Sequence, residues 1–104
     1  MRMFVNFKKT AGSAESLVMS SQIARINVKD ANTVIVFIKN ADDLAQDSIS
    51  ITTGTSNNAP AVALRLAEEI ANGTVNNGGP VLTVVKGVAP FADVDGVGGY
   101  VLGS

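Results

Sequence analysis

The stretch "IARINVKDANTVIVFIK", residues 23–39, decides the fold because it contains two strand patterns separated by a turn. Residues 33–39 are almost all β-branched or aromatic, which is typical of a strand. Apolar and polar residues alternate in residues 23–30, which is typical of a half-buried strand. The polar residues between the two patterns favour a turn. The stretch therefore predicts an antiparallel β-hairpin.

The expected register of this hairpin places apolar residues on both of its faces. If Asp30 lies opposite Thr33, the inner face combines residues of both strands, namely Ile26, Val28, Ile35 and Phe37. The same register leaves three apolar residues on the outer face: Val34, Val36 and Ile38. An apolar outer face needs a cover, so the second strand is either buried on both faces or contacts a partner.

Shorter patterns predict further strands on both sides of the hairpin. In residues 1–9, Met1, Met3, Val5 and Phe7 alternate with Arg2, Phe4, Asn6 and Lys8. The other expected strands are residues 16–21, residues 48–52 with Ile49 and Ile51 on the buried face, and residues 80–87. Residues 40–47 form a polar connection that has room for one helical turn around Leu44.

Residues 57–74, "NNAPAVALRLAEEIANGT", carry a clear helical pattern. Asn57 or Asn58 suits the N-cap, and Pro60 suits the first turn. Gly73 suits the C′ position, which favours a left-handed backbone. One broad apolar face follows the three-and-four spacing: Ala59, Val62, Ala63, Leu66, Ala67, Ile70 and Ala71. The small alanines let this helix lie close against a sheet.

Strands with a single helix predict an α+β fold. We expect a small, strongly bent antiparallel sheet or a partly open barrel of about five or six strands, with the helix of residues 59–72 packed on it. A chain of 104 residues suffices for one domain, residues 1–104. Residues 87–104 hold five of the ten glycines and are expected to form an irregular C-terminal tail with a short strand at 100–102.

The composition excludes several kinds of chemistry. The chain has no Cys, so it has no disulfide, thiolate nucleophile or thiolate metal site. It has no His either, which removes the commonest general base and metal ligand. We therefore predict that the protein is not an enzyme, that it has no catalytic, cofactor-binding or metal site, and that it uses no cofactor.

Two acidic patterns do not change this prediction. Glu68 and Glu69 are neighbours on the expected helix and point about 100° apart, so this spacing does not let them share a proton or a metal ion. We expect them to form surface ion pairs with Arg65. Residues 93–96, "DVDG", resemble the start of a calcium loop, but the later ligand positions do not match.

Charge is distributed unevenly along the chain. Residues 1–40 hold six basic and two acidic residues, a net charge of +4, whereas residues 41–104 hold two basic and seven acidic residues, a net charge of −5. This asymmetry fits a nucleic-acid-binding half, contact between the basic and acidic faces of two copies, or simply solvated charge. The candidate basic surface consists of Lys8, Lys9, Arg25, Lys29 and Lys39.

The segments "MFVNF", "IARINVKDANTVIVFIKN" and "ALRLAEEIANG" resemble, in their order and pattern, small proteins encoded by marine bacteriophages and found in oceanic metagenomes. The resemblance covers residues 3–86 and implies a virion-associated or accessory phage protein. A second resemblance is to Sm-like small barrels, which form rings and bind RNA. Those proteins carry their helix before the strands, unlike this chain, and their signature is missing here.

Taken together, these patterns predict a non-catalytic structural or assembly protein that forms a homo-oligomer. The candidate interface consists of Val34, Val36, Ile38 and Leu64, the last lying at the edge of the helix's apolar face. Other virion proteins are further candidate partners, and the alternative function is nucleic-acid binding by an Sm-like oligomeric module. No apolar run has the roughly 18 residues of a membrane span, so we expect no membrane partner. The phage resemblance implies a location in the host cytoplasm or the virion.

Overall fold

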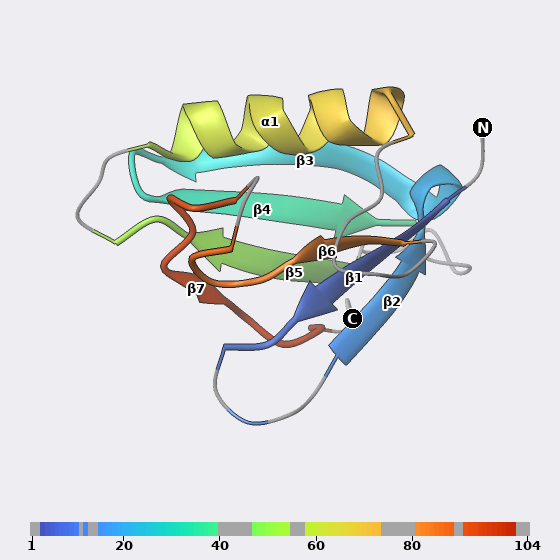
Figure 1. Ribbon diagram of the computed structural model, residues 1–104, viewed down its shortest axis with the longest axis horizontal. Helices are drawn as coiled ribbons and strands as arrows, with labels where there is room; N and C mark the ends of the chain where they lie inside the picture. The colour runs from blue at the N-terminus through green and yellow to red at the C-terminus, as the bar shows by residue number, and fades with distance from the viewer. Residues whose placement is uncertain are drawn as a thin grey trace.

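A computed structural model describes residues 3–10, 12, 15–39, 47–54, 58–73, 81–88 and 91–101. The expected helical turn at Leu44, the candidate cap Asn57 and the end of the strand expected at 100–102 lie outside these residues. The described part has the α+β fold that the sequence predicts, with one helix and strands in two sheets (Figure 1). The two sheets are not closed into a barrel.

The three-stranded sheet has the order β2-β1-β6. It consists of β1 (Phe4–Lys8), β2 (Glu15–Met19) and β6 (Val81–Val84). β1 pairs antiparallel with β2 but parallel with β6. The sheet is therefore mixed, whereas the sequence led us to expect antiparallel strands throughout.

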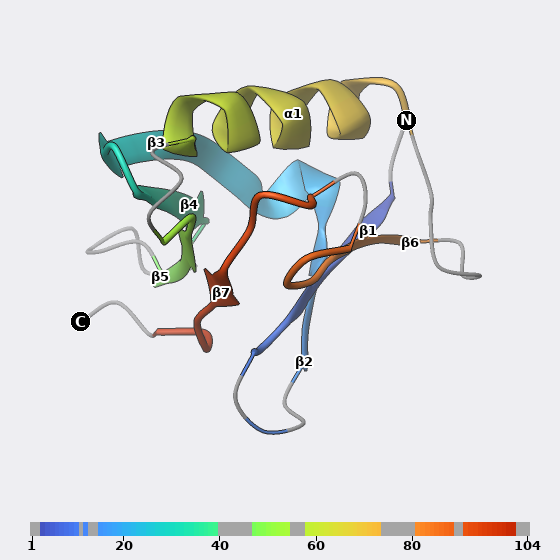
Figure 2. The same cartoon turned by 60° about the vertical axis from the view of Figure 1, so that its left-hand side comes forward.

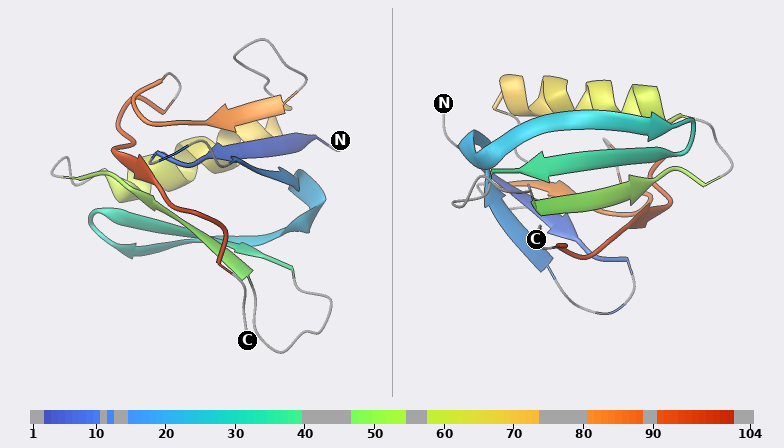
Figure 3. Two further views of the ribbon diagram at one scale, coloured as in Figure 1. Left: turned by 90° about the horizontal axis from the view of Figure 1, so that it is seen from below. Right: turned by 180° about the vertical axis from the view of Figure 1, so that it is seen from behind.

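The four-stranded sheet has the order β3-β4-β5-β7 and is antiparallel. It consists of β3 (Ile23–Asp30), β4 (Thr33–Ile38), β5 (Asp47–Thr52) and β7 (Gly96–Val97). A short 3-10 helix, η1 (Ser20–Gln22), connects β2 to β3 and thus joins the two sheets. Figures 2 and 3 show the two sheets as separate layers.

The hairpin β3–β4 forms as predicted, but its register differs and reverses the faces of β4. Asp30 lies opposite Thr33, and an irregularity at Lys29 then shifts the pairing, so that Val28 lies opposite Val34. Because side chains alternate along a strand, a shift of one residue exchanges its two faces. The predicted outer face of β4 is therefore the inner one.

Val34, Val36 and Ile38 accordingly lie in the core, and the first two have no exposed surface. The sequence left open whether the chain itself or a partner covers these three candidate interface residues, and in the structure the chain itself covers them. Ile35 and Phe37, expected inside, lie on the other face of β4 and are half-buried.

The helix α1 (Ala59–Ala71) lies along β3 and β4 (Figure 1). Its predicted apolar face is confirmed for Ala59, Val62, Ala63 and Leu66, which are buried, whereas Ala67 and Ala71 are exposed. Asn58 occupies the N-cap position without a capping bond from its side chain. The first helical N–H, that of Ala59, instead donates to the carbonyl of Ala31 in the β3–β4 turn. This bond joins the start of the helix to the hairpin.

Gly73 ends the helix as predicted, with a positive φ of 67° and its N–H bonded to the carbonyl of Ile70.

The buried apolar residues form one cluster between the inner faces of both sheets and α1. Its members are Met3, Val5, Phe7, Val18, Val34, Val36, Ile38, Ile49, Ile51, Ala59, Val62, Ala63, Leu66, Leu82, Val84, Phe91, Val94 and Val97.

The Gly-rich C-terminal segment is not only a surface tail. It contributes Phe91, Val94 and Val97 to the core and runs antiparallel to β5. The short strand lies at Gly96–Val97, and at the expected position of a strand Val101 forms an isolated bridge with Ser48. Glycine lets the segment lie close to β5, because a Cβ at Gly98 would lie 3.3 Å from the Ser50 carbonyl oxygen.

Candidate interaction surface

The outer face of the three-stranded sheet carries exposed apolar residues that the predicted interface did not include. Burial alternates along β1 and β2, so that Val5, Phe7 and Val18 point into the core. Phe4 and Leu17 point outward and are 42% and 57% exposed. Apolar groups of this size at the surface favour contact with another molecule when they gather on one face.

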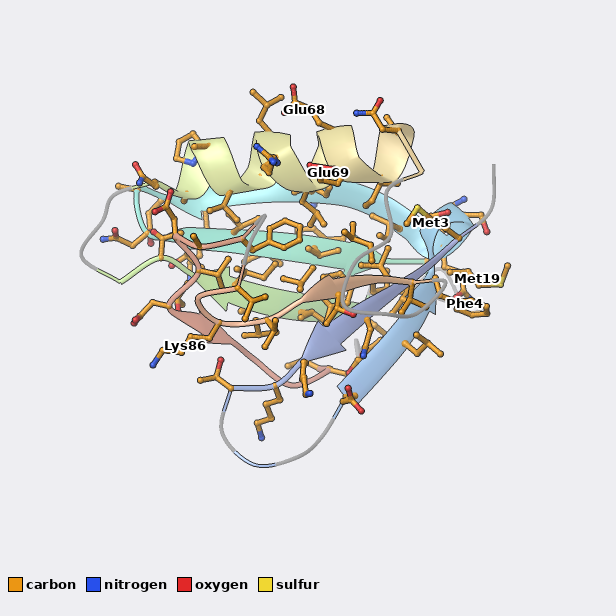
Figure 4. The ribbon with its side chains drawn as sticks, in the orientation of Figure 1. Met3, Phe4, Met19, Glu68, Glu69 and Lys86 are labelled. Atoms are coloured by element: carbon orange, nitrogen blue, oxygen red, sulfur yellow. The ribbon has the colours of Figure 1, made fainter. Side chains whose placement is uncertain are left out.

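The strand register gathers these groups. Phe4 on β1 has Met19 of β2 and Val81 of β6 as its cross-strand neighbours. Figure 4 shows Phe4 and Met19 together at one end of the sheet. We call the set of Phe4, Leu17, Met19 and Val81 the outer apolar face. In the described part of the chain no helix or strand covers it.

Polar and charged residues lie at the opposite end of this sheet face. Asn6 lies opposite Leu17, and its Nδ2 donates to Glu15 Oε1 at 2.9 Å. Lys8 lies opposite Glu15 at the end of the sheet. A shallow pocket of about 450 Å³ extends from Asn6, Lys8 and Glu15 over β6 to Val88. The face is thus apolar at one end and charged at the other.

A second shallow pocket, of about 230 Å³, lies between α1 and the segment that contains Phe91. Leu64, the remaining residue of the predicted interface, lines it and is 61% exposed. Arg65 and Glu68 line the same pocket, but Arg65 Nε donates to Glu69 Oε2 at 2.7 Å, which confirms that predicted ion pair. Leu64 therefore stands apart from the outer apolar face, on a different element.

Figure 4 shows Glu68 and Glu69 leaving α1 in different directions, as their spacing predicts. Among the described residues, no group of three or more Asp and Glu side chains is placed to hold a metal ion. Asp93 of the DVDG segment instead accepts a hydrogen bond from Asn58 Nδ2 at 3.2 Å, and the Asp95 N–H donates to the Thr52 carbonyl. The two aspartates of DVDG therefore take part in the packing of the C-terminal segment.

The five residues of the candidate basic surface are all exposed, but the fold distributes them over both sheets. Lys8 and Lys9 lie at the end of β1, whereas Arg25 and Lys29 lie on β3. Arg25 also stacks over the ring of Phe37, with its guanidinium carbon 4.4 Å from the ring centroid. This contact covers the half-buried Phe37 on the outer face of the four-stranded sheet.

Tyr100 and Asp47 form a hydrogen-bonded pair in which the pKa of Tyr100 is raised. The Tyr100 hydroxyl donates to Asp47 Oδ2 at 2.6 Å. Burial, this hydrogen bond and the charge of Asp47 together raise the pKa of Tyr100 to about 12. The pair ties the C-terminal segment to the start of β5.

The sequence contains one signal for the outer apolar face. Phe4 falls on the polar side of the alternating pattern in residues 1–9, between Arg2 and Asn6. An aromatic residue on a side that is otherwise polar indicates a surface contact. Sequence alone did not show that β2 would bring Leu17 and Met19 to the same sheet face as Phe4.

No family model matches this chain, and neither a curated protein nor a solved structure matches it. In the described residues, no helix is long and apolar enough to cross a membrane.

Proposed function

We propose that the protein is a non-catalytic structural or assembly protein that associates with copies of itself through the outer apolar face. The observation that carries this proposal is the joint exposure of Phe4 and Leu17 on one face of the three-stranded sheet. The absence of Cys and His from the sequence supports a role in binding rather than in catalysis. From the sequence resemblance alone, we add that the assembly belongs to a phage virion or is accessory to one.

Nucleic-acid binding is less well supported. A phosphate backbone is contacted most effectively by basic residues clustered on one surface. Here the pairs Lys8–Lys9 and Arg25–Lys29 lie on different sheets. The protein should accordingly show little retention on heparin at low salt.

Multi-angle light scattering over a range of concentrations tests the proposed function. We expect the mean mass to rise above 10.7 kDa as concentration increases from tens to hundreds of micromolar. Replacing Phe4 and Leu17 together by serine should shift the protein toward the monomer. A mass that stays monomeric over the whole range contradicts self-association.

A matched double variant controls for the general loss of surface hydrophobicity. Leu64 and Val28 are also exposed apolar residues, but they lie on α1 and β3 rather than on the outer apolar face. Replacing these two by serine should leave association unchanged. If this control dissociates the protein and the Phe4 and Leu17 variant does not, the interface lies elsewhere.

A further inference from the structure

Among the strand edges in the described part, the outer edge of β2 is the longest that has a regular register and no facing like charges. β7 has only two residues. β3 is long, but it carries Arg25, Lys29 and two register irregularities, and charges and bulges of this kind block pairing at an edge. β6 has four residues. β2 has five residues in uninterrupted register, with Glu15 as its single charged residue.

The hydrogen bonds around η1 show which backbone groups of β2 face this edge. The Ser20 N–H donates to the Met3 carbonyl at 2.7 Å, so Met3 and Ser20 form a hydrogen-bonded pair at the end of the β1–β2 ladder. Bonded and non-bonded pairs alternate in an antiparallel ladder. Ser16 and Val18 therefore bond to β1, whereas the N–H and C=O groups of Glu15, Leu17 and Met19 point away from it.

Both outward groups of Met19 already have partners, because its carbonyl is that of the η1 N-cap and accepts the first bond of that helix. The Met19 N–H donates to Gln22 Oε1 at 3.1 Å, which confirms that the odd-numbered residues of β2 face outward. Leu17 keeps both its N–H and its C=O directed at the open edge, and Glu15 does the same. A strand edge of this kind is a template for another strand.

We propose that β2 pairs antiparallel with β2 of a second copy of this chain, across a two-fold axis at Leu17. This rests on the proposed self-association and places the contact at the β2 edge of the outer apolar face, with Leu17 at the axis and Phe4 one strand away. The Leu17 N–H of each copy donates to the Leu17 carbonyl of the other, and each Glu15 N–H is directed at the opposite Met19 carbonyl, which also accepts the first bond of η1. The two small sheets become one continuous sheet with the order β6-β1-β2-β2-β1-β6.

The side chains of β2 fit this pairing. Residues directly opposite each other in a ladder lie on the same face, so the two Leu17 side chains meet on the joined outer apolar face. Glu15 lies opposite Met19, and Ser16 lies opposite Val18, so no like charges face each other. On β3, a two-fold axis at Asn27 would place Arg25 opposite Lys29 and would be unfavourable.

A second copy suits this edge better than an unrelated strand because β2 is self-complementary. Leu17 is its central residue, so a two-fold axis there leaves all five residues of β2 paired. Pairing through one strand buries little area, at the weak end of specific interfaces. We therefore expect a dimer that dissociates in the micromolar range.

Charge substitution at Leu17 tests the axis directly. In a two-fold pairing, position 17 faces itself, so Leu17→Lys and Leu17→Glu each place like charges opposite each other. Each variant alone should weaken association by about tenfold or more. An equimolar mixture of the two variants should recover association, because lysine then lies opposite glutamate. Leu17 is exposed, so both variants should fold, as circular dichroism can verify.

Leu64→Lys is the matched control, since Leu64 is exposed to a similar extent and lies on α1. It should associate like the unmodified protein. If the unmodified protein associates but Leu17→Lys does so equally well, Leu17 lies outside the interface and the β2 pairing is wrong, while self-association itself stands. If the mixture fails to recover association, the axis does not lie at Leu17. If the unmodified protein is monomeric throughout, both proposals fail.

A cross-link gives an independent readout. Opposite Cα atoms in a hydrogen-bonded antiparallel pair lie about 5.5 Å apart, within the range that a disulfide spans. The chain has no cysteine, so Leu17→Cys supplies a single thiol. Mild oxidation should convert this variant into a covalent dimer much faster than Leu64→Cys. Equal rates for the two variants would overturn the pairing.

Discussion

Thr10 and Val97 exchange two hydrogen bonds across the two sheets. The Thr10 N–H donates to the Val97 carbonyl at 3.1 Å, and the Val97 N–H donates to Thr10 Oγ1 at 2.7 Å. Met3 and Ser20 make the same kind of reciprocal contact at the other end of β1, where the Met3 N–H donates to Ser20 Oγ at 3.2 Å. A hydroxyl side chain therefore holds the chain at each end of β1.

We expect Thr10→Val to destabilise the protein by about 1–2 kcal/mol, because it leaves the Val97 N–H without its acceptor in a partly buried position. Thr10→Ser keeps the hydroxyl and should lose much less. Urea denaturation of both variants measures the difference. If Thr10→Val lost no more stability than Thr10→Ser, the hydroxyl of Thr10 would not be the stabilising group.

The Tyr100–Asp47 pair predicts a dependence of stability on alkaline pH. In the folded protein the pKa of Tyr100 is raised from 10.0 to about 12. Its contribution to stability is therefore fully present below about pH 10 and is lost as pH rises toward 12, because only the unfolded chain releases the proton in that window. The difference in stability between the unmodified protein and Tyr100→Phe should shrink over this window.

Tyr100 is the single tyrosine, and the chain has no tryptophan, so near-ultraviolet absorbance follows its ionisation without interference. Replacing Asp47 by asparagine removes the negative charge beside the phenol and should lower the pKa of Tyr100. An unchanged titration in Asp47→Asn would contradict a role for this charge.

Substitutions at Gly54 and Gly12 distinguish the cost of backbone strain from the cost of a steric contact. Both have a positive φ, of 59° and 88°. A Cβ at Gly54 would lie 2.9 Å from Asp95 Oδ2, whereas a Cβ at Gly12 would meet nothing within 4 Å. We expect Gly12→Ala to destabilise the protein by about 1 kcal/mol and Gly54→Ala to destabilise it by more.

The additional destabilisation expected for Gly54→Ala comes from the contact with Asp95, which a second substitution can relieve. Combining Gly54→Ala with Asp95→Ala removes the contacts with Asp95 Oδ2 and Cγ, leaves its Cβ at 3.2 Å, and should reduce the loss due to alanine at position 54 toward that of Gly12→Ala. Thermal denaturation of the variants, with Asp95→Ala alone as reference, measures this coupling. Additive effects would mean that Asp95 moves aside without cost.

Substitutions in α1 and β4 distinguish core positions from surface positions. Leu66 and Val36 have no exposed surface, so Leu66→Asp or Val36→Glu places a charge in the core and should unfold the protein. Replacing Glu68 and Glu69 together by alanine removes a surface ion pair and should change stability by less than about 0.5 kcal/mol. Circular dichroism and urea denaturation check both expectations. A folded Val36→Glu variant would contradict the position of Val36 in the core.

The pattern of single elements could be predicted from the sequence because it depends on neighbours in the chain. The alternation of Met3, Val5 and Phe7, the isoleucines of β5 and the stripe of Val62 and Leu66 on α1 all lie on the expected faces. The helix was expected at residues 59–72 and extends from Ala59 to Ala71. Periodicity determines these features, since a side chain's direction follows from its position within one strand or helix.

The face of β4 could not be predicted in this way. Its residues are apolar on both sides, so the pattern does not distinguish the inner face, and the irregularity at Lys29 decides it. The same holds for the association of β1 with β6, which are more than seventy residues apart and run parallel. Pairings of this kind depend on how the whole chain packs.

The sequence by itself determined the α+β class, the helix, the strand-forming segments and the absence of Cys and His chemistry, because composition and local periodicity contain this information. Only the tertiary structure decided which apolar residues remain at the surface. It placed Val34 and Val36 under the helix and the other sheet, and it left Leu17 at an open edge beside Phe4. Burial is a property of the surroundings of a side chain, and those surroundings come mostly from residues far away in the chain.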